Sequence, residues 1–356
     1  MSRLLCAWFV VAIILTALPA KADLEQARAA FLRGDYPAAA RELPSYAESG
    51  NTLAQIMLGV MYMEGRGLPK DEAKAIELLR KAADANDARA FYPLGGAYME
   101  SGPATQDPQE AMRWLRKASD NGHAKANTLI GILHEGEKGL PRNDEAAAAA
   151  FLQAADLGEP DGQGRLAQAF LAGAGVDKNE ERALYWAQRA DAQGNVYGAG
   201  VLSVMHMEGL GGLAKDDAAA FRYLQRAADR GSARAQNNLG SFYILGRGTK
   251  KNLAEGIAWW EKSVAQNYPE ALTNLGEYLV LGQGVPQNYT RALELFGRAA
   301  AQQHERAIYN IGTMVLRGQG VEQDFDKAVM LFRLAAEKGS PDAQEALEKL
   351  AGDKRL

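Results

Sequence analysis

The 356-residue sequence predicts an all-α fold, an α-solenoid of about eight antiparallel helix pairs with a cap at each end. A glycine turn recurs at intervals of 36 residues, as at Gly246, Gly282 and Gly318. Within each interval, small, aliphatic and bulky residues four positions apart mark one face of a first helix. An Asp or Asn then opens a second helical pattern. Because neither helix can bury its apolar face alone, the pairs are expected to stack.

Residues 1–22 have the pattern of a secretory signal peptide. Arg3 precedes an apolar run over 4–18, and Ala20-Lys21-Ala22 gives the small-x-small pattern of a cleavage site. We expect cleavage after Ala22 and a periplasmic or secreted protein, with no stable membrane insertion after cleavage. The alternative is an uncleaved anchor, although the run is short for the ~20 residues that a membrane span needs.

Composition limits the classes of partner. The net charge is −4, and no cluster of basic residues stands out, so nucleic acid is not an expected partner. The single cysteine, Cys6, lies in the signal segment, so the exported chain has no disulfide. Its stability is expected to come from packing.

The first helix of each unit is defined by one aliphatic position with a small residue four positions earlier. Eight units fit end to end; they are 51–86, 87–122, 123–158, 159–194, 195–231, 232–267, 268–303 and 304–339. The aliphatic residues are Leu58, Leu94, Ile130, Leu166, Leu202, Leu239, Leu275 and Ile311. The following residue is Gly in six units, Ala167 in the fourth and Ser203 in the fifth, which lets a second helix approach closely.

The second helix of each unit starts at a residue suited to an N-cap. These residues are Asp71, Asp107, Asn143, Asn179, Asp216, Asn252, Asn288 and Asp324. The second helices end at Gly or Asn, which suit a left-handed cap, whereas Gln303 is a poor cap. The glycine turn therefore leads into an N-cap, and we interpret it as a structural turn rather than a phosphate-binding loop.

Two further segments flank the eight units. Residues 23–50 are expected to form a divergent helix pair, with Asp35 as the N-cap of its second helix. Residues 340–356 are expected to form a capping helix, because Ser340 and Pro341 suit the start of a helix that runs to about Leu350.

The segment ARAQNNLGSFYILGRGTKKNLAEGIAWWEKSVAQN, over 233–267, resembles a Sel-one-like repeat, a relative of the tetratricopeptide repeat. The resemblance covers residues 51–339 and implies a right-handed α-superhelix that acts as a scaffold for protein complexes. Secreted bacterial relatives include regulators of envelope signalling and proteins that meet host factors. A cysteine-rich branch is linked to penicillin binding, but this chain lacks those cysteines. The family has no shared catalytic residues.

The residues that carry chemistry elsewhere have structural explanations in this pattern. His304-Glu305 begins like a zinc-protease helix, but Ile308 stands where the second histidine would be. No Gly-x-Ser-x-Gly or Ser-x-x-Lys motif occurs. We therefore predict no catalytic residue, metal site or cofactor, and a protein that is not an enzyme.

Departures from the repeat pattern mark two candidate partner-binding sets in the last units. Leu253, Tyr289 and Phe325 follow the N-cap, where earlier units mostly carry acids, and predict an apolar stripe. The alternative is that each packs on its neighbour's loop. A second set, on first helices, could clamp a peptide backbone or could be the ordinary repeat residue; it consists of Asn238, Asn274 and Asn310.

The fourth and fifth repeats depart from the repeat pattern by carrying glycine inside their helices. Gly162, Gly164, Gly198 and Gly200 lie inside helical patterns, where each costs about 1 kcal/mol relative to Ala. We interpret residues 159–212 either as a soft joint, which would exchange amide hydrogens first, or as drift without function.

The expected function is that of an exported scaffold that binds a protein or peptide in the bacterial envelope, and that could regulate a signalling or assembly partner. The alternatives are a cell-wall or glycan-acting envelope protein and a secreted factor that interacts with a host. The partner, the choice between periplasm and secretion, and the oligomeric state stay open at this point.

Overall fold

The structure is a computed structural model that describes residues 22–136 and 138–352. The described part contains 19 helices and no strand, which confirms the predicted all-α class. The predicted signal segment lies outside the described residues, except that Ala22 begins the first helix. None of the described helices combines the length and apolar character that a membrane crossing requires.

The chain divides after Gln193 into two compact units, each of which contains several of the predicted repeats. This boundary falls inside residues 159–212, the segment interpreted from the sequence either as a soft joint or as drift without function. The helices of the first unit are α1 (Ala22–Leu32), α2 (Tyr36–Glu48), α3 (Thr52–Glu64), α4 (Glu72–Asp84), α5 (Ala88–Glu100), α6 (Pro108–Asp120), α7 (Ala124–His134), α8 (Asp144–Asp156), α9 (Pro160–Ala172) and α10 (Glu180–Ala192). The helices of the second unit are α11 (Val196–Glu208), α12 (Asp217–Asp229), α13 (Ala233–Leu245), α14 (Leu253–Ala265), α15 (Pro269–Leu281), α16 (Tyr289–Ala300), α17 (Glu305–Arg317), α18 (Phe325–Glu337) and α19 (Pro341–Gly352).

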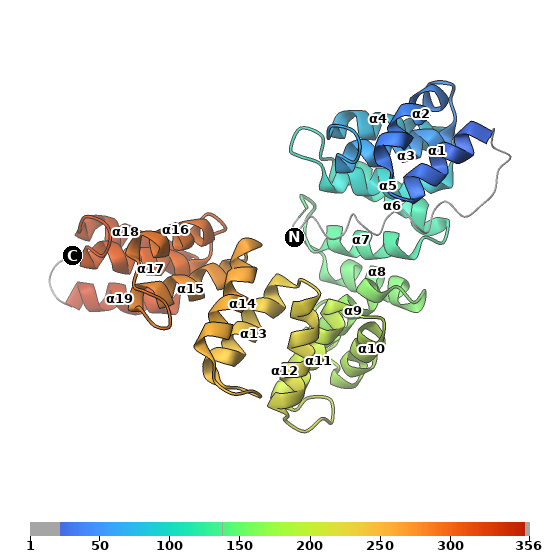
Figure 1. Ribbon diagram of the computed structural model, residues 1–356. Helices are drawn as coiled ribbons and strands as arrows, with labels where there is room; N and C mark the ends of the chain where they lie inside the picture. Colours follow the sequence, from blue (N-terminus) through green and yellow to red (C-terminus); the bar gives the residue numbers. More distant parts are fainter. Residues whose placement is uncertain (1–21, 137, 353–356) are drawn as a thin grey trace. The chain divides into compact units, whose positions relative to one another are not determined.

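Within each unit, every helix packs against the next one along the chain, which gives a stack of helix pairs (Figure 1). The first helix of each predicted repeat carries an odd number and the second helix an even number. Neighbouring first helices also touch one another, as α3 touches α5, α7 touches α9 and α15 touches α17. These contacts place first helices of successive repeats side by side.

All eight predicted N-caps of the second helices are confirmed. In each case the Asp or Asn side chain accepts a hydrogen bond from a backbone N–H in the first turn. Asp35 caps α2 in the same way. Each such cap contributes about 1 kcal/mol.

The glycine that follows the aliphatic residue brings the two helices of a pair together. A Cβ atom on Gly240 would lie 2.5 Å from Cδ1 of Trp260, and one on Gly276 would lie 2.5 Å from Cε1 of Phe296. In the fifth repeat Ser203 takes this position, and its hydroxyl donates to the carbonyl of Ala220 at 3.0 Å. The small residue therefore sets how closely the second helix approaches.

The glycine turn connects the two helices of a pair and packs against the preceding pair. Its first glycine ends the first helix in the left-handed conformation, as Gly246 does at φ 72°. Its second glycine lies against the start of the preceding second helix, where a Cβ atom on Gly248 would be only 2.0 Å from the carbonyl oxygen of Asp217. Both glycines are thus required by the backbone.

The second helices also end as predicted, with a left-handed residue after the last turn. Where glycine is absent, Asn86, Asn267 and Gln303 adopt φ values of 61°, 59° and 62°. Gln303 therefore takes the left-handed conformation although its side chain does not favour it.

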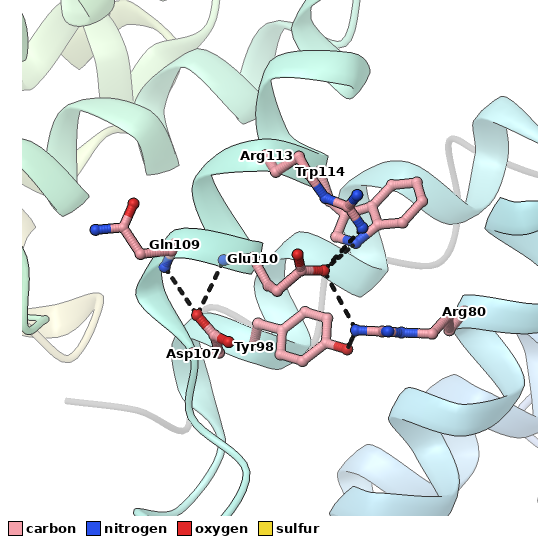
Figure 2. A network of polar contacts seen from close by, with 7 residues as sticks. All are labelled: Arg80, Tyr98, Asp107, Gln109, Glu110, Arg113 and Trp114. Atoms are coloured by element: carbon pink, nitrogen blue, oxygen red, sulfur yellow. Dashed lines mark hydrogen bonds and ion pairs between the residues drawn. The ribbon is translucent and has the colours of Figure 1, made fainter.

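Polar contacts between second helices add to the apolar core. One oxygen of Glu110 on α6 accepts hydrogen bonds from Arg80 on α4 at 3.2 Å, from Arg113 at 2.9 Å and from the indole of Trp114 at 3.1 Å (Figure 2). Arg80 also donates to the hydroxyl of Tyr98 on α5. This network ties three successive helices of the first unit together.

Candidate functional site

The predicted apolar stripe of Leu253, Tyr289 and Phe325 lies at the starts of α14, α16 and α18, and all three side chains are half-buried. The next turn covers part of the first two. A Cβ atom on Gly284 would lie 3.3 Å from Cβ of Leu253, and one on Gly320 would lie 2.6 Å from Cβ of Tyr289. Leu253 and Tyr289 thus pack on the neighbouring loop, which was the alternative interpretation of the stripe.

The three predicted asparagines lie at one repeat position on α13, α15 and α17, and all are half-buried. Asn237 Nδ2 donates to Asn238 Oδ1 at 3.2 Å, and Asn274 Nδ2 donates to Asn237 Oδ1 at 2.9 Å. The position of Asn237 is held by Trp260, whose indole N–H donates to the Asn237 carbonyl at 3.0 Å. The network therefore crosses from α13 to α15.

The same network continues from α15 to α17. A guanidinium nitrogen of Arg306 donates to Asn274 Oδ1, and Arg306 Nε lies 3.2 Å from Glu277 Oε1. Asn310 Nδ2 donates to that carboxylate oxygen at 2.8 Å. We call this set the polar ladder; its members are Asn237, Asn238, Asn274, Glu277, Arg306 and Asn310.

The three asparagines are not equivalent in the polar ladder. The amide group of Asn274 is used on both sides, by Asn237 and by Arg306. In contrast, Asn238 Nδ2 and Asn310 Oδ1 have no hydrogen-bond partner among the described residues. The polar ladder therefore ends in an open donor on α13 and an open acceptor on α17, which can pair with the backbone of a bound peptide.

Two exposed leucines on the same helices are not among the predicted site residues. Leu245 ends α13 and is 72% exposed, and Leu281 ends α15 and is 60% exposed. Each lies seven residues after the ladder asparagine of its helix, which places it on the same helix face two turns away. A comparison along this repeat position would have found them, because three of the five earlier repeats carry an acid there, namely Glu64, Glu100 and Glu208.

Those acids form ion pairs in the earlier repeats. Glu64 pairs with Arg66 at 2.6 Å, Glu100 with Lys138 at 3.3 Å, and Glu208 with Lys215 at 3.9 Å. The replacement of such charges by leucine in two successive repeats leaves apolar surface in contact with water.

The histidines have structural contacts in the described part of the chain. His123 stacks on Tyr92 with ring centroids 4.0 Å apart, and burial lowers the pKa of His123 to about 4. His206 stacks on Tyr223, and His304 Nδ1 lies 3.2 Å from the Thr273 hydroxyl. Within residues 22–136 and 138–352, no group of three or more His, Cys, Asp or Glu side chains is arranged to hold a metal ion.

Tyr268 is the N-cap residue of α15, the helix that carries Asn274 and Glu277 of the polar ladder. Burial, followed by the charge of Glu270, raises the pKa of Tyr268 to about 12. The phenol is therefore a neutral hydrogen-bonding group at neutral pH. The arrangement as a whole offers amide, guanidinium, carboxylate and hydroxyl groups for recognition.

The sequence matches the family model described as Sel1 repeat eight times. The matched residues are 52–87, 92–123, 124–159, 160–195, 197–232, 233–268, 269–304 and 305–340. The predicted units differ from these by one residue at most boundaries, and the second match begins later, inside α5.

Two solved bacterial structures are similar to this chain. One is a Sel1 repeat protein from Oxalobacter formigenes, with 25% sequence identity, a TM-score of 0.55, and coverage of 95% of this chain and 98% of the other. The second is a protective antigen present in uropathogenic Escherichia coli strains, with 28% identity and a TM-score of 0.55. That match covers 87% of this chain and 66% of the antigen, so this chain spans just under two thirds of the antigen's length.

The eight matched repeats account for the 36-residue period, the glycine turns and the capped second helices, and they extend over most of the sequence. The chain belongs to the Sel1 repeat family.

Proposed function

We propose that this chain is an exported, non-catalytic scaffold that binds a protein or peptide partner in the bacterial envelope. The polar ladder on α13, α15 and α17 carries the proposal. It presents an unpaired amide donor at Asn238 and an unpaired amide acceptor at Asn310, one at each end of a hydrogen-bonded network. A hydrogen bond that a ligand makes to each of these groups contributes about 0.5–1.5 kcal/mol net.

An extended peptide backbone suits these two groups. Its C=O groups can accept from Asn238, and its N–H groups can donate to Asn310. The hydrogen bonds of Asn274 to Asn237 and Arg306 hold the polar ladder in place. Because the polar ladder exists before binding, little conformational entropy is lost on association. The stack of α13, α15 and α17 thus provides a preorganised surface.

The proposed location rests on the signal pattern of residues 1–22, with removal after Ala22. N-terminal sequencing of the protein from fractionated cells tests it. A periplasmic or medium fraction that begins at Asp23 is expected, whereas a cytoplasmic protein that retains Met1 or Arg3 would contradict export.

A second candidate function is that of a secreted factor that meets a host. The similarity to the protective antigen favours it, within the shared length of the two chains. Recovery of the protein from culture medium, together with binding to host-cell extract but not to envelope extract, distinguishes this candidate from an envelope scaffold.

The binding experiment uses the chain from Asp23 onward as bait in envelope extract, followed by titration with the purified partner. The double variant Asn238→Ala and Asn310→Ala is expected to weaken binding by about tenfold or more. The matched control is Asn121→Ala, an exposed asparagine of the first unit that lies outside the polar ladder. Equal affinity of wild type and double variant, with unchanged helical melts, would reject the polar ladder as the binding site.

A further inference from the structure

The most exposed apolar side chains at one repeat position are Leu245 and Leu281. Their neighbourhood in the sixth and seventh repeats is also distinctive in charge. The turns 246–252 and 282–288 contain no acidic residue, and Lys250 and Lys251 are exposed without an ion pair among the described residues. We call this set the turn-edge patch; its members are Leu245, Lys250, Lys251 and Leu281.

The same edge of the first unit has the opposite character. There, Glu72 binds the backbone N–H of Gly102 at 2.7 Å and pairs with Lys70 at 2.6 Å, and Glu100 pairs with Lys138. Those acids are solvated and neutralised. The turn-edge patch therefore combines positive charge that forms no ion pair with exposed apolar surface. This combination complements a partner that is acidic and apolar.

The separation of Leu245 and Leu281 indicates which secondary structure of a partner can contact both. Asn274 on α15 donates to Asn237 on α13, which places these two helices side by side, and neighbouring helices lie roughly 8–10 Å apart. A separation of the same order is expected for Leu245 and Leu281, the last residues of the two helices. Residues seven apart on an α-helix lie on one face and about 10.5 Å apart along its axis. In an extended strand, residues three apart are about 10 Å apart but point to opposite sides. A helix thus places two apolar side chains beside the two leucines.

We propose that the turn-edge patch docks an acidic amphipathic helix of a partner protein. Two apolar side chains of that helix, seven residues apart, contact Leu245 and Leu281, and acidic side chains on its flank pair with Lys250 and Lys251. This inference rests on the proposed binding function and adds a second contact, two helical turns away from the polar ladder.

The test measures fluorescence anisotropy of a labelled 18-residue helical peptide with the chain from Asp23 onward. The peptide carries two leucines seven residues apart and glutamates on the flanking positions. Matched peptides place the leucines five apart, replace glutamate by lysine, or carry leucines three apart in a proline-rich sequence. We expect the first peptide to bind about tenfold or more tightly than each of the others.

Variants of the protein locate the binding. Leu245→Glu with Leu281→Glu is expected to lower the affinity for the first peptide about tenfold or more. Lys250→Glu with Lys251→Glu is expected to weaken its binding and to reverse the effect of salt, because added salt screens the new repulsion between the glutamates of the protein and those of the peptide. The matched control is Met330→Glu, because Met330 on α18 is 69% exposed and lies outside the turn-edge patch. Urea midpoints check that each variant stays folded.

Several outcomes overturn the proposal. They are equal binding of the lysine peptide, tighter binding of the proline-rich peptide, an equal loss with Met330→Glu, or no loss with the leucine variants. Sedimentation with phosphatidylglycerol vesicles that depends on the two leucines would assign the patch to a membrane surface instead. A partner that is lost with the Asn238 and Asn310 variants but kept by the leucine variants would leave the proposed function in place and reject this surface.

Discussion

Arg80 on α4 and Glu110 on α6 form an ion pair at 3.2 Å, at the two repeat positions where Glu261 and Arg291 form one with the charges exchanged. Arg80 lies nine residues after its N-cap, as Glu261 does, and Glu110 lies three residues after its N-cap, as Arg291 does. The stacking geometry therefore accommodates opposite charges at these positions in either order.

This relationship predicts that the pair can be exchanged in the second unit. Glu261→Arg alone places two arginines together and is expected to lower the free energy of unfolding by up to about 1 kcal/mol, since both side chains are partly exposed. Adding Arg291→Glu should restore stability or exceed it, because an acid in the first turn also meets the helix dipole. Urea unfolding of the wild type, the two single variants and the double variant gives the coupling energy between the two positions. A double variant as unstable as Glu261→Arg would contradict the exchange.

Two helical glycines are expected to respond oppositely to alanine. A Cβ atom on Gly200 meets nothing within 4 Å, so Gly200→Ala should raise the free energy of unfolding by about 0.5–1 kcal/mol. A Cβ atom on Gly240 would lie 2.5 Å from Trp260 and 2.8 Å from the carbonyl oxygen of Gly256, so Gly240→Ala should lower it by about 1–3 kcal/mol. Thermal and urea unfolding measure both, and destabilisation by Gly200→Ala would show that this residue has a packing role.

Replacement of Gln303 by glycine is expected to stabilise the protein. Gln303 holds φ at 62°, a conformation that costs an ordinary residue about 1–2 kcal/mol. Gln303→Gly should therefore raise the free energy of unfolding by about 1 kcal/mol. Gln303→Ala is the control, because it also removes the 2.7 Å hydrogen bond from Lys338 but keeps the strained backbone. Equal stability of the two variants would argue against backbone strain.

His123 is expected to make the protein acid-sensitive. Burial, followed by the charge of Lys125, lowers its pKa from 6.5 to about 4, so folding favours the neutral imidazole. The contribution of this residue to stability is therefore present above about pH 6.5 and is lost as the pH falls toward 4.

His123→Asn tests this expectation. Asn51 and Asn195 hold the same repeat position and cap α3 and α11 through their side chains, so the variant can cap α7. The loss of stability between pH 6.5 and 4 should be smaller in the variant than in the wild type. Parallel pH profiles of the two proteins would rule out His123 as the group responsible.

Much of the fold is predictable because repetition multiplies each local signal. A single Asp or Asn is a weak indicator of a helix start, but eight at one repeat position, such as Asp71 and Asn252, predict all eight caps correctly. The Gly240 position likewise predicts close helix packing, which Trp260 confirms. Each residue in such a position acts within its own pair, so its role is readable along the sequence.

The polar ladder was only partly predictable, because its members occupy different repeat positions. Asn238, Asn274 and Asn310 share one position, but Asn237, Glu277 and Arg306 complete the network from three others. Their contacts depend on how neighbouring first helices are placed, which periodicity along the chain does not specify. Leu245 and Leu281 were missed because a leucine that ends a helix does not reveal its exposure.

The hydrogen bonds that join neighbouring helix pairs connect residues close in the chain, as Arg80 to Glu110 at 30 residues, Gln266 to Gly231 at 35, and Asn274 to Asn237 at 37. Closing loops of this length costs little entropy, and each pair needs only its neighbour to become stable. Such a chain can acquire structure progressively from either end, without waiting for distant segments to arrive.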